Sequence, residues 1–212
     1  MNENSNACAL SYNAQPVVLA SASQIRRRLL ENAGIAVDVI KAKVDEAVIR
    51  ETLLADGDME PGDIAEILAQ AKAENVSLHH GDRVVIAADQ ILSFDRRIYE
   101  KPQDYNQARA HLLAFSGHMH TLYSAVVLAA EGQVVWSHVD TACVWMRTVS
   151  PEFVGRYLAR AGETALSSVG CYELEGVGLN LVEKVEGDYF TVLGLPMLPL
   201  LDELRRRDII ES

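Results

Sequence analysis

The stretch VVLASASQIRRRLLENAGI, residues 17–35, decides the fold class. It opens with three aliphatic residues, continues through a turn that contains two serines, and then carries apolar residues at helical spacing. Ser23 is a suitable N-cap and Gly34 a suitable C′ residue, so we expect a helix between them. A short apolar strand that leads directly into a helix is typical of α/β proteins.

The three consecutive arginines in this stretch are predicted to differ in role. At about 100° per residue, Arg26 falls inside the apolar sector of the helix, whereas Arg27 and Arg28 fall on the opposite face. Arg27 precedes Glu31 by four residues, the spacing of a surface ion pair. A guanidinium beside the free N–H groups of a helix N-terminus is suited to binding phosphate. A buried ion pair or a snorkelling side chain is the alternative for Arg26.

Later segments continue the pattern. We expect strands at 35–44, 83–92, 119–130 and 133–146, a turn at 93–97, a glycine-rich β-like region at 169–196, and helices at 46–55, 63–76, 104–115, from 151 onward and at 196–207. Asp63 with Glu66 resembles a capping box at the start of the third helix. Because strands and helices alternate early and the later strands form hairpins, we predict a mixed twisted sheet flanked by helices, in two lobes around a central cleft.

Composition excludes several classes of protein. The chain has 212 residues and a formal net charge of −11, which argues against a protein that tracks along nucleic acid. Its three cysteines show neither zinc nor disulfide spacing, no signal peptide is apparent, and no apolar run approaches the ~20 residues of a membrane span. We therefore expect a cytoplasmic protein with a polar tail at 1–15 and one domain at 16–212.

Asp89 is the most informative single residue. It lies within RVVIAADQIL, residues 83–92, where every neighbour except Gln90 is small or apolar as far as Val84 and Leu92. An aspartate in a buried strand is costly unless it is paired, bound to a metal or catalytic. Asp89 could therefore orient a metal ion or take a proton from water.

Other charged residues could converge on Asp89. Lys72 lies on the flank of its predicted helix, where it could reach a cleft or extend along the surface. A hairpin could bring Lys101 back beside Asp89, although an ordinary surface lysine is the alternative. Either Asp45 or Glu46 could bind a metal, or the two could form a solvated pair. These residues together suggest phosphoryl chemistry on a nucleotide-like ligand.

A series of motifs over residues 17–202 adds a resemblance. In order they are LASAS, VDE, LAQAKA, IAADQ, EKP, SGHMH, YELEGVG and GDYFTVLGLP. In this order they resemble the Maf family of nucleoside triphosphate pyrophosphatases. The resemblance implies a fold like that of inosine triphosphate pyrophosphatases, a homodimer, and hydrolysis of nucleoside triphosphates to the monophosphate and pyrophosphate with Mg²⁺ or Mn²⁺.

The resemblance also implies roles for individual residues. Asp89 corresponds to the proton acceptor and, with Glu46, to the metal ligands. Ser23 and Arg26 match phosphate-binding positions, and Lys72 and Lys101 match catalytic lysines of the cleft.

This chain departs from the family pattern at positions linked to the base. Ile25 stands where the family has Arg or Trp. Gln90 and Glu175 resemble the subgroup that acts on 7-methylguanosine triphosphate rather than the dTTP/UTP subgroup. A non-catalytic nucleotide-binding regulator of cell division or septum formation is the alternative function. The combination of Asp89 with Lys72 and Lys101 favours an enzyme, because a regulator that only binds nucleotides needs no base.

Overall fold

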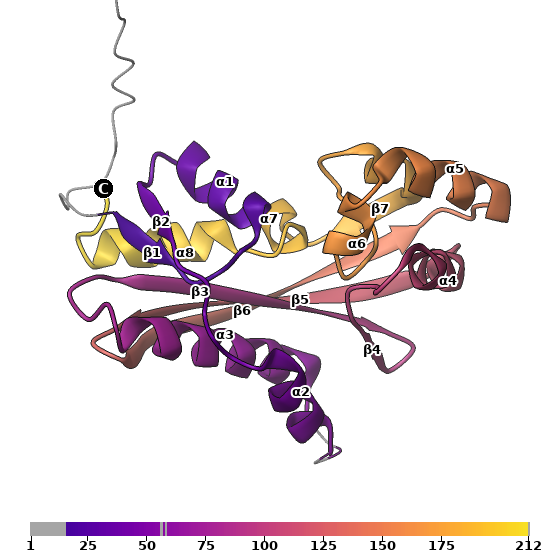
Figure 1. Ribbon diagram of the computed structural model, residues 1–212. Coiled ribbons are helices and arrows are strands. Elements are labelled where there is room, and N and C mark those ends of the chain that lie inside the picture. Colours follow the sequence, from indigo (N-terminus) through magenta and orange to yellow (C-terminus); the bar gives the residue numbers. More distant parts are fainter. Residues whose placement is uncertain (1–15, 56, 58, 212) are drawn as a thin grey trace, which may run out of the picture.

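The computed structural model describes residues 16–55, 57 and 59–211, and it shows a mixed α/β fold (Figure 1). The tail predicted at 1–15 lies outside the described residues. The strands are β1 (Val17–Leu19), β2 (Val37–Val39), β3 (Val85–Phe94), β4 (Arg97–Tyr99), β5 (Met119–Ala130), β6 (Gln133–Met146) and β7 (Val182–Glu186). The helices are α1 (Gln24–Asn32), α2 (Glu46–Ala55), α3 (Pro61–Ser77), α4 (Tyr105–Phe115), α5 (Pro151–Ala161), α6 (Thr164–Ser167), η1 (Val177–Leu181), α7 (Tyr189–Val192) and α8 (Met197–Arg206).

The seven strands form one sheet in the order β2-β1-β3-β5-β6-β7, with β4 paired to β3. Strand β1 runs parallel to β2 and β3, and the other pairs are antiparallel, which confirms the predicted mixed sheet. Helix α3 covers one face, while α1, α7 and α8 lie on the other (Figure 1). Among the described residues, none of the helices combines the length and apolar character needed to cross a bilayer.

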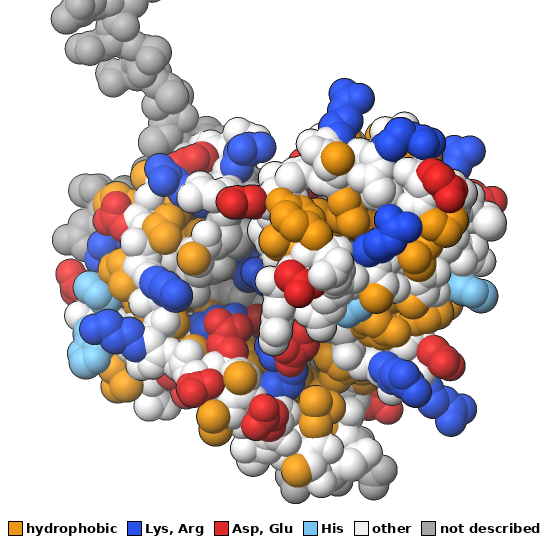
Figure 2. All heavy atoms as spheres, turned by 45° about the vertical axis from the view of Figure 1, so that its right-hand side comes forward, with side chains coloured by type: hydrophobic (Ala, Val, Ile, Leu, Met, Phe, Trp, Pro, Cys, Tyr) orange, Lys and Arg blue, Asp and Glu red, His pale blue; other side chains and the backbone are white. Residues whose placement is uncertain are grey.

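The central strand β3 creates the cleft. Along one edge it pairs with β5 from Val85 to Ser93. On its other edge it pairs with β1 only at residues 85–86 and with β4 only at residues 92–94. On this second edge, between β1 and β4, residues 87–91 pair with no strand of the described chain. Figure 2 shows a cleft between two halves of the molecule, with acidic and basic side chains gathered in it. The two predicted lobes are therefore joined by one sheet.

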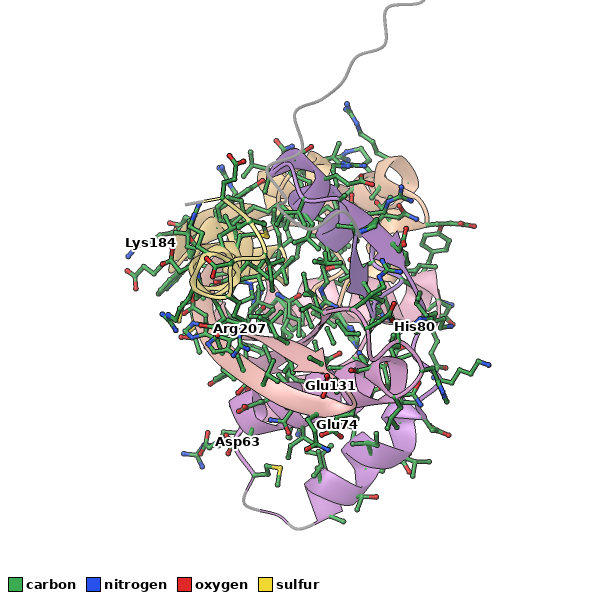
Figure 3. All side chains as sticks on the ribbon, turned by 90° about the vertical axis from the view of Figure 1, so that its left-hand side faces the viewer. Asp63, Glu74, His80, Glu131, Lys184 and Arg207 are labelled. Atoms are coloured by element: carbon green, nitrogen blue, oxygen red, sulfur yellow. The ribbon has the colours of Figure 1, made fainter. Side chains whose placement is uncertain are left out.

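Local signals placed most of the helices correctly. The side chains of Ser23, Asp104 and Ser150 cap α1, α4 and α5 by accepting backbone N–H groups three residues ahead. Gly34 has φ 77°, as expected of a C′ residue. The β5–β6 hairpin turns at Glu131 and Gly132, both with positive φ, as in a two-residue type I′ turn. Figure 3 views this end of the molecule, where Glu131 lies beside the C-terminal half of α3, and Gly132 N–H donates to Ser77 Oγ at 3.0 Å.

Three local predictions were wrong. The capping box at Asp63 does not form, because α3 begins earlier, with Pro61 in its first turn and Glu60 as a cap residue without a side-chain bond. Residues 93 and 94 extend β3, and the turn is confined to Asp95 and Arg96, both with positive φ. The strand expected at 35–44 has only three residues. The N–H of Ile40 makes a last bond to the Leu19 carbonyl, and Ile40 and Ala42 pack against the cluster that includes α3.

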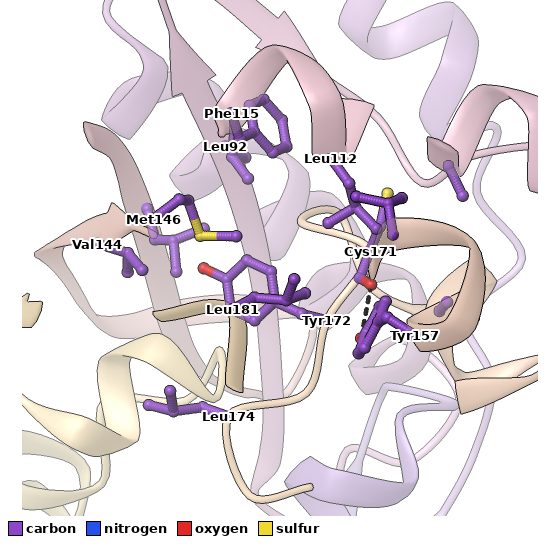
Figure 4. Close-up of a cluster of buried hydrophobic side chains, with 14 of the residues drawn as sticks. Leu92, Leu112, Phe115, Val144, Met146, Tyr157, Cys171, Tyr172, Leu174 and Leu181 are labelled. Atoms are coloured by element: carbon purple, nitrogen blue, oxygen red, sulfur yellow. Dashed lines mark hydrogen bonds between the residues drawn. The ribbon is translucent and has the colours of Figure 1, made fainter. Parts of the chain in front are cut away.

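The glycine-rich region 169–196 is also not the β-structure that we expected, because only β7 forms there. Before β7, the chain winds through an irregular loop and η1, which close a cluster of buried side chains (Figure 4). Tyr157 OH donates to the carbonyl of Cys171 at 2.9 Å and anchors the start of this loop. Gly178 holds its other end, because a Cβ there would lie 2.5 Å from the carbonyl oxygen of Glu173. Tertiary contact therefore replaces strand pairing in this segment.

This close approach predicts different tolerance at two neighbouring glycines. Gly178→Ala should lower the free energy of unfolding by about 1–3 kcal/mol or more, because the clash is with backbone that cannot give way. Gly176→Ala should cost less than about 1 kcal/mol, since its nearest contact would be an ordinary 3.7 Å. Urea unfolding of both variants measures the difference. Equal stability of the two variants would contradict the packing described for this loop.

Candidate active site

A lysine held between two carboxylates forms the centre of the site. Lys72 Nζ lies 2.5 Å from Asp89 Oδ1 and 2.8 Å from Glu46 Oε2. Lys72 comes from α3, Asp89 from the middle of β3, and Glu46 from the first turn of α2. Lys72 and Asp89 are each only 7% exposed, so this is a buried ion pair with a half-exposed third member. The predicted convergence of these residues is confirmed.

Asp45 and Glu46 were both candidate metal ligands, and the structure distinguishes them. Asp45 Oδ1 accepts the backbone N–H of Val48 at 3.2 Å and so caps α2. Glu46 is the residue that reaches Lys72. The helix start therefore sets which carboxylate enters the site.

Arg26 points inward, as predicted, but mostly towards backbone carbonyls. Its Nε donates to the Gly194 carbonyl at 2.8 Å, and one terminal nitrogen donates to the Ala88 carbonyl at 2.7 Å and to Ser21 Oγ at 3.3 Å. Burial lowers the pKa of the guanidinium, and the charges of Asp89 and Glu46 oppose that shift. Its other terminal nitrogen makes no hydrogen bond within the described chain and remains available to an anion.

The β3–β4 hairpin returns Lys101 to the same charged group. The residue as a whole is exposed. Desolvation of its ammonium group is nevertheless the largest cause that lowers the pKa of Lys101, and the charge of Arg26 is the second. Lys72 lowers that pKa further, while Glu46 and Asp89 raise it. Three cations thus share one electrostatic environment with two carboxylates, which leaves a formal charge of +1 suited to a polyanion.

Other residues of α1 follow the predicted division. Arg27 Nε lies 2.7 Å from Glu31 Oε1 in an exposed pair, and Arg28 is exposed. Ser23 Oγ accepts the N–H of Arg26 at 3.4 Å, so its hydroxyl lies at the helix start beside the cleft. Ile25 packs against the apolar cluster beneath α1.

Gln90 lies on the opposite face of the sheet from Asp89, because side chains alternate along a strand. Its amide nitrogen donates to Ser124 Oγ at 3.0 Å and to the carbonyls of Thr191 and Val192 at 3.1 Å each. The amide nitrogen of this predicted substrate-binding residue therefore holds α7 in place. Only its carbonyl oxygen is left for a ligand.

Glu175 lines a separate pocket of about 560 Å³ next to α7. Its lining residues are Leu174, Glu175, Leu179, Val185, Gly187 and Tyr189. Sequence reasoning singled out neither Tyr189 nor the nearby Glu173, although they lie within the quoted motifs GDYFTVLGLP and YELEGVG. Gln90 binds α7 and Arg26 binds Gly194 just beyond it, so both residues contact the segment that carries Tyr189.

The site is chemically suited to a small divalent cation. Among the described residues, no group of three or more His, Cys, Asp or Glu side chains gathers to form a complete cage. Glu46 and Asp89 nevertheless converge on one atom, Lys72 Nζ. Mg²⁺ commonly takes one or two carboxylates and completes its shell with water and substrate phosphate. The two carboxylates therefore fit such an ion.

The buried pair predicts strong energetic coupling. A double-mutant cycle with Lys72→Met and Asp89→Asn should give an interaction energy of about 2–3 kcal/mol in urea unfolding, because Lys72→Met leaves the buried Asp89 carboxylate without its partner and Asp89→Asn removes the buried charge that the ammonium faces. The matched control is Arg27→Met with Glu31→Gln, a pair at 2.7 Å whose side chains are 48% and 44% exposed. That exposed pair should give about 0.3–0.5 kcal/mol. Similar values for both cycles would refute the burial argument.

Relatives of known activity match most of the chain. A 7-methyl-GTP pyrophosphatase of Rhizobium meliloti (strain 1021) is 49% identical over 196 residues, covering 92% of this chain and 98% of the relative. A nucleoside triphosphate pyrophosphatase of Granulibacter bethesdensis is 45% identical over 194 residues, with coverages of 92% and 98%.

A solved nucleoside triphosphatase (dITP/XTP pyrophosphatase) from Mycobacterium abscessus is 17% identical, covers 69% of this chain and 94% of its own, and has a TM-score of 0.31. The family model described as Maf-like protein matches residues 16–207. On this match and on the close relatives, the chain belongs to the Maf-like family.

Proposed function

We propose that this protein is a nucleoside triphosphate pyrophosphatase, which hydrolyses the bond between the α- and β-phosphates and releases a nucleoside monophosphate and pyrophosphate. The observation that carries the proposal is the buried Lys72–Asp89 pair with Glu46, at the open edge of β3 and beside the cations Arg26 and Lys101. The names of the relatives from Rhizobium meliloti and Granulibacter bethesdensis support it.

Arg26, Lys72 and Lys101 bind and neutralise the triphosphate. The available terminal nitrogen of Arg26 and the N-terminus of α1 point to an anion near Ser23. Lys101 reaches the same environment from the opposite lobe, so that a triphosphate in the cleft meets cations on both sides. Such preorganised charge stabilises the negative charge that develops on the leaving pyrophosphate.

Asp89 is the proton acceptor. Its Oδ1 is fixed by Lys72, which leaves Oδ2 to accept a hydrogen bond from water. The water oxygen attacks the α-phosphorus, the bond from that phosphorus to the bridging oxygen breaks, and pyrophosphate leaves with the bonding electron pair. The proton of the attacking water passes to Asp89 and then to solvent.

A divalent cation, Mg²⁺ or Mn²⁺, completes the proposal. Glu46 and Asp89 would hold it, and it would supply neutralisation of phosphate charge and polarisation of the phosphoryl group. Lys72 keeps the two carboxylates aligned by binding both of them. Glu46, 44% exposed at its side chain, has the freedom to turn towards a ligand that enters from the cleft.

We also propose 7-methylguanosine triphosphate as a preferred substrate, so that the protein clears modified nucleotides. Support comes from the name of the relative in Rhizobium meliloti and from Glu175, which lines the pocket next to α7. The role of Ile25 in base choice stays a prediction, since its observed contacts are with the core. A cytoplasmic location and a homodimer are further parts of the proposal, and light scattering during gel filtration measures the latter.

The alternative, a nucleotide-binding regulator of cell division, would need the cationic half of the site alone. It gives no reason to bury Asp89 against Lys72 at the bottom of the cleft, at a cost in desolvation. The names of the relatives favour the enzyme.

Asp89→Asn tests the catalytic assignment. It should lower pyrophosphate release from 7-methylguanosine triphosphate with Mg²⁺ by about 10²–10⁴-fold, because amide oxygen is a poor proton acceptor. Nucleotide affinity, measured by calorimetric titration, should change far less. The control Asp202→Asn, on the exposed face of α8, should leave release unchanged. Full activity of Asp89→Asn would show that this residue is not the proton acceptor. If the unaltered protein released no pyrophosphate from any nucleotide, the proposal that it is a pyrophosphatase would be wrong.

The arginines of α1 provide a second test. Arg26→Ala should lower kcat/KM for guanosine triphosphate and its 7-methyl form alike, by about 10- to 100-fold, since phosphate is common to both. Arg26→Lys should recover only part of this, because an ammonium cannot span the Gly194 and Ala88 carbonyls in the same geometry. Arg27→Ala, one residue away, should match the unaltered protein. Equal losses from Arg26→Ala and Arg27→Ala would contradict the division of roles along α1.

A further inference from the structure

Helix α2 carries a residue of the candidate site although little of the helix is buried. It lies beside α3 at the periphery of the molecule (Figure 1). None of its residues from 46 to 55 is buried, and only Ile49 and Leu53 pack on the apolar cluster that includes α3. A helix of ten residues is marginal by itself in water. Contacts with the rest of the molecule must therefore hold α2, and with it Glu46, in place.

Two charged side chains of α2 bond to two different elements. Glu46 and Arg50 are four residues apart, a spacing at which they could pair with each other. Instead, Glu46 Oε2 lies 2.8 Å from Lys72 Nζ on α3, and Arg50 Nη1 lies 2.5 Å from Glu100 Oε1. Glu100 directly follows β4 and directly precedes Lys101. The second ion pair therefore joins the helix that carries Glu46 to the segment that carries Lys101.

The surroundings of Arg50 do not suit a pair whose only role is to stabilise the fold. Its side chain is 15% exposed, whereas that of Glu100 is 60% exposed, so one member is largely withdrawn from water. Arg50 Nε is buried and finds no acceptor in the described chain. A buried donor without an acceptor costs stability, and burial also keeps this nitrogen from a ligand in the cleft. The position that the pair imposes explains Arg50 better than a gain in stability does.

Apolar packing brings α2 and β4 to the same cluster without fixing how they lie relative to each other. Ile49 and Leu53 of α2 and Ile98 of β4 contact one set of buried residues. Hydrophobic contact is non-directional, whereas an ion pair with a hydrogen bond has a defined geometry. The charge of Glu46 influences the pKa of Lys101, so these two side chains share one environment. An error in the placement of α2 would therefore alter the site.

We propose that the Arg50–Glu100 bridge holds α2 against the end of β4 and thereby positions Glu46 and Lys101 relative to each other. Arg50 and Glu100 are positioning residues, because they act through their neighbours and need not touch the substrate. This role rests on the proposed pyrophosphatase function, since Glu46 and Lys101 are residues of a reaction only in that proposal.

Arg50→Met and Glu100→Gln each remove the bridge. Methionine also removes the buried donor that lacks an acceptor, so the melting temperature should change by less than about 3 °C in either variant. Pyrophosphate release from 7-methylguanosine triphosphate with Mg²⁺ should nevertheless fall about 10-fold. The double variant should also lose about 10-fold, because both residues act through one contact. Independent roles would instead multiply to a loss of about 100-fold.

Arg50→Lys distinguishes the bridge from simple packing by the side chain. Only one guanidinium nitrogen of Arg50 bonds to Glu100, so an ammonium can replace it. Arg50→Lys should therefore release pyrophosphate within about three-fold of the unaltered protein. The same substitution combined with Glu100→Gln should recover nothing. If packing of the aliphatic stem were the cause, methionine would serve as well as lysine.

Hydrogen exchange followed by mass spectrometry observes the bridge without turnover. Peptides that cover α2 should exchange faster in Arg50→Met and in Glu100→Gln than in the unaltered protein, while peptides that cover β5 should not change. The matched control is Asp38→Asn in β2, on the far side of β1 from the site. Asp38 pairs with Arg83 at 2.7 Å, and their side chains are 54% and 15% exposed. This variant should change neither the exchange of α2 nor pyrophosphate release.

The outcomes separate the bridge from the function on which it rests. Full turnover by Arg50→Met and Glu100→Gln, a loss of about 100-fold in the double variant, or no recovery in Arg50→Lys would overturn the positioning role and leave the pyrophosphatase intact. If the unaltered protein releases no pyrophosphate from any nucleotide, the proposed function fails. Hydrogen exchange then decides whether the bridge holds α2, and unchanged exchange of α2 in both variants would overturn it.

Discussion

The site depends on the contact of one ammonium with two carboxylates. Lys72 joins α3 to β3 through Asp89 and to α2 through Glu46. A buried aspartate is tolerated in the middle of β3 because this lysine compensates its charge. The strand can expose that aspartate to a ligand because residues 87–91 face no other described strand on the cleft side. Charge compensation and an interrupted sheet edge thus produce the position that we propose to be reactive.

The two halves of the cleft are connected through Arg26 and Gln90. Arg26 ties the start of α1 to the backbone of β3 and to Gly194, and Gln90 ties the other face of β3 to α7. The start of α1 and the segment that carries Tyr189 are thereby both attached to the middle of β3. In the proposed function, this arrangement would let one end of a nucleotide be recognised by charge common to all triphosphates and the other end by features of the base.

Sequence alone predicted what local signals determine. The caps at Ser23, Asp104 and Ser150 and the β5–β6 hairpin are decided within a few residues, and all were found. The inward position of Arg26 followed from helical periodicity. Periodicity left Lys72 undecided, and only the family resemblance assigned it to the cleft, because its partner Asp89 is 17 residues away. The loop before η1 could not be predicted, since its shape comes from Gly178 packing on Glu173. Tyr189 lies within the quoted motif GDYFTVLGLP, but nothing local in the sequence places it in the same pocket lining as Glu175.

The central claim is that water held by Asp89 attacks the α-phosphorus. Hydrolysis in ¹⁸O-labelled water, followed by mass spectrometry of both products, tests it most directly. Attack at the α-phosphorus places one labelled oxygen in the nucleoside monophosphate and leaves the pyrophosphate unlabelled. Label in pyrophosphate, or labelled orthophosphate released from the end of the chain, would show that the water attacks a different phosphorus and would contradict the assignment of Asp89, Lys72 and Arg26 around the α-phosphate.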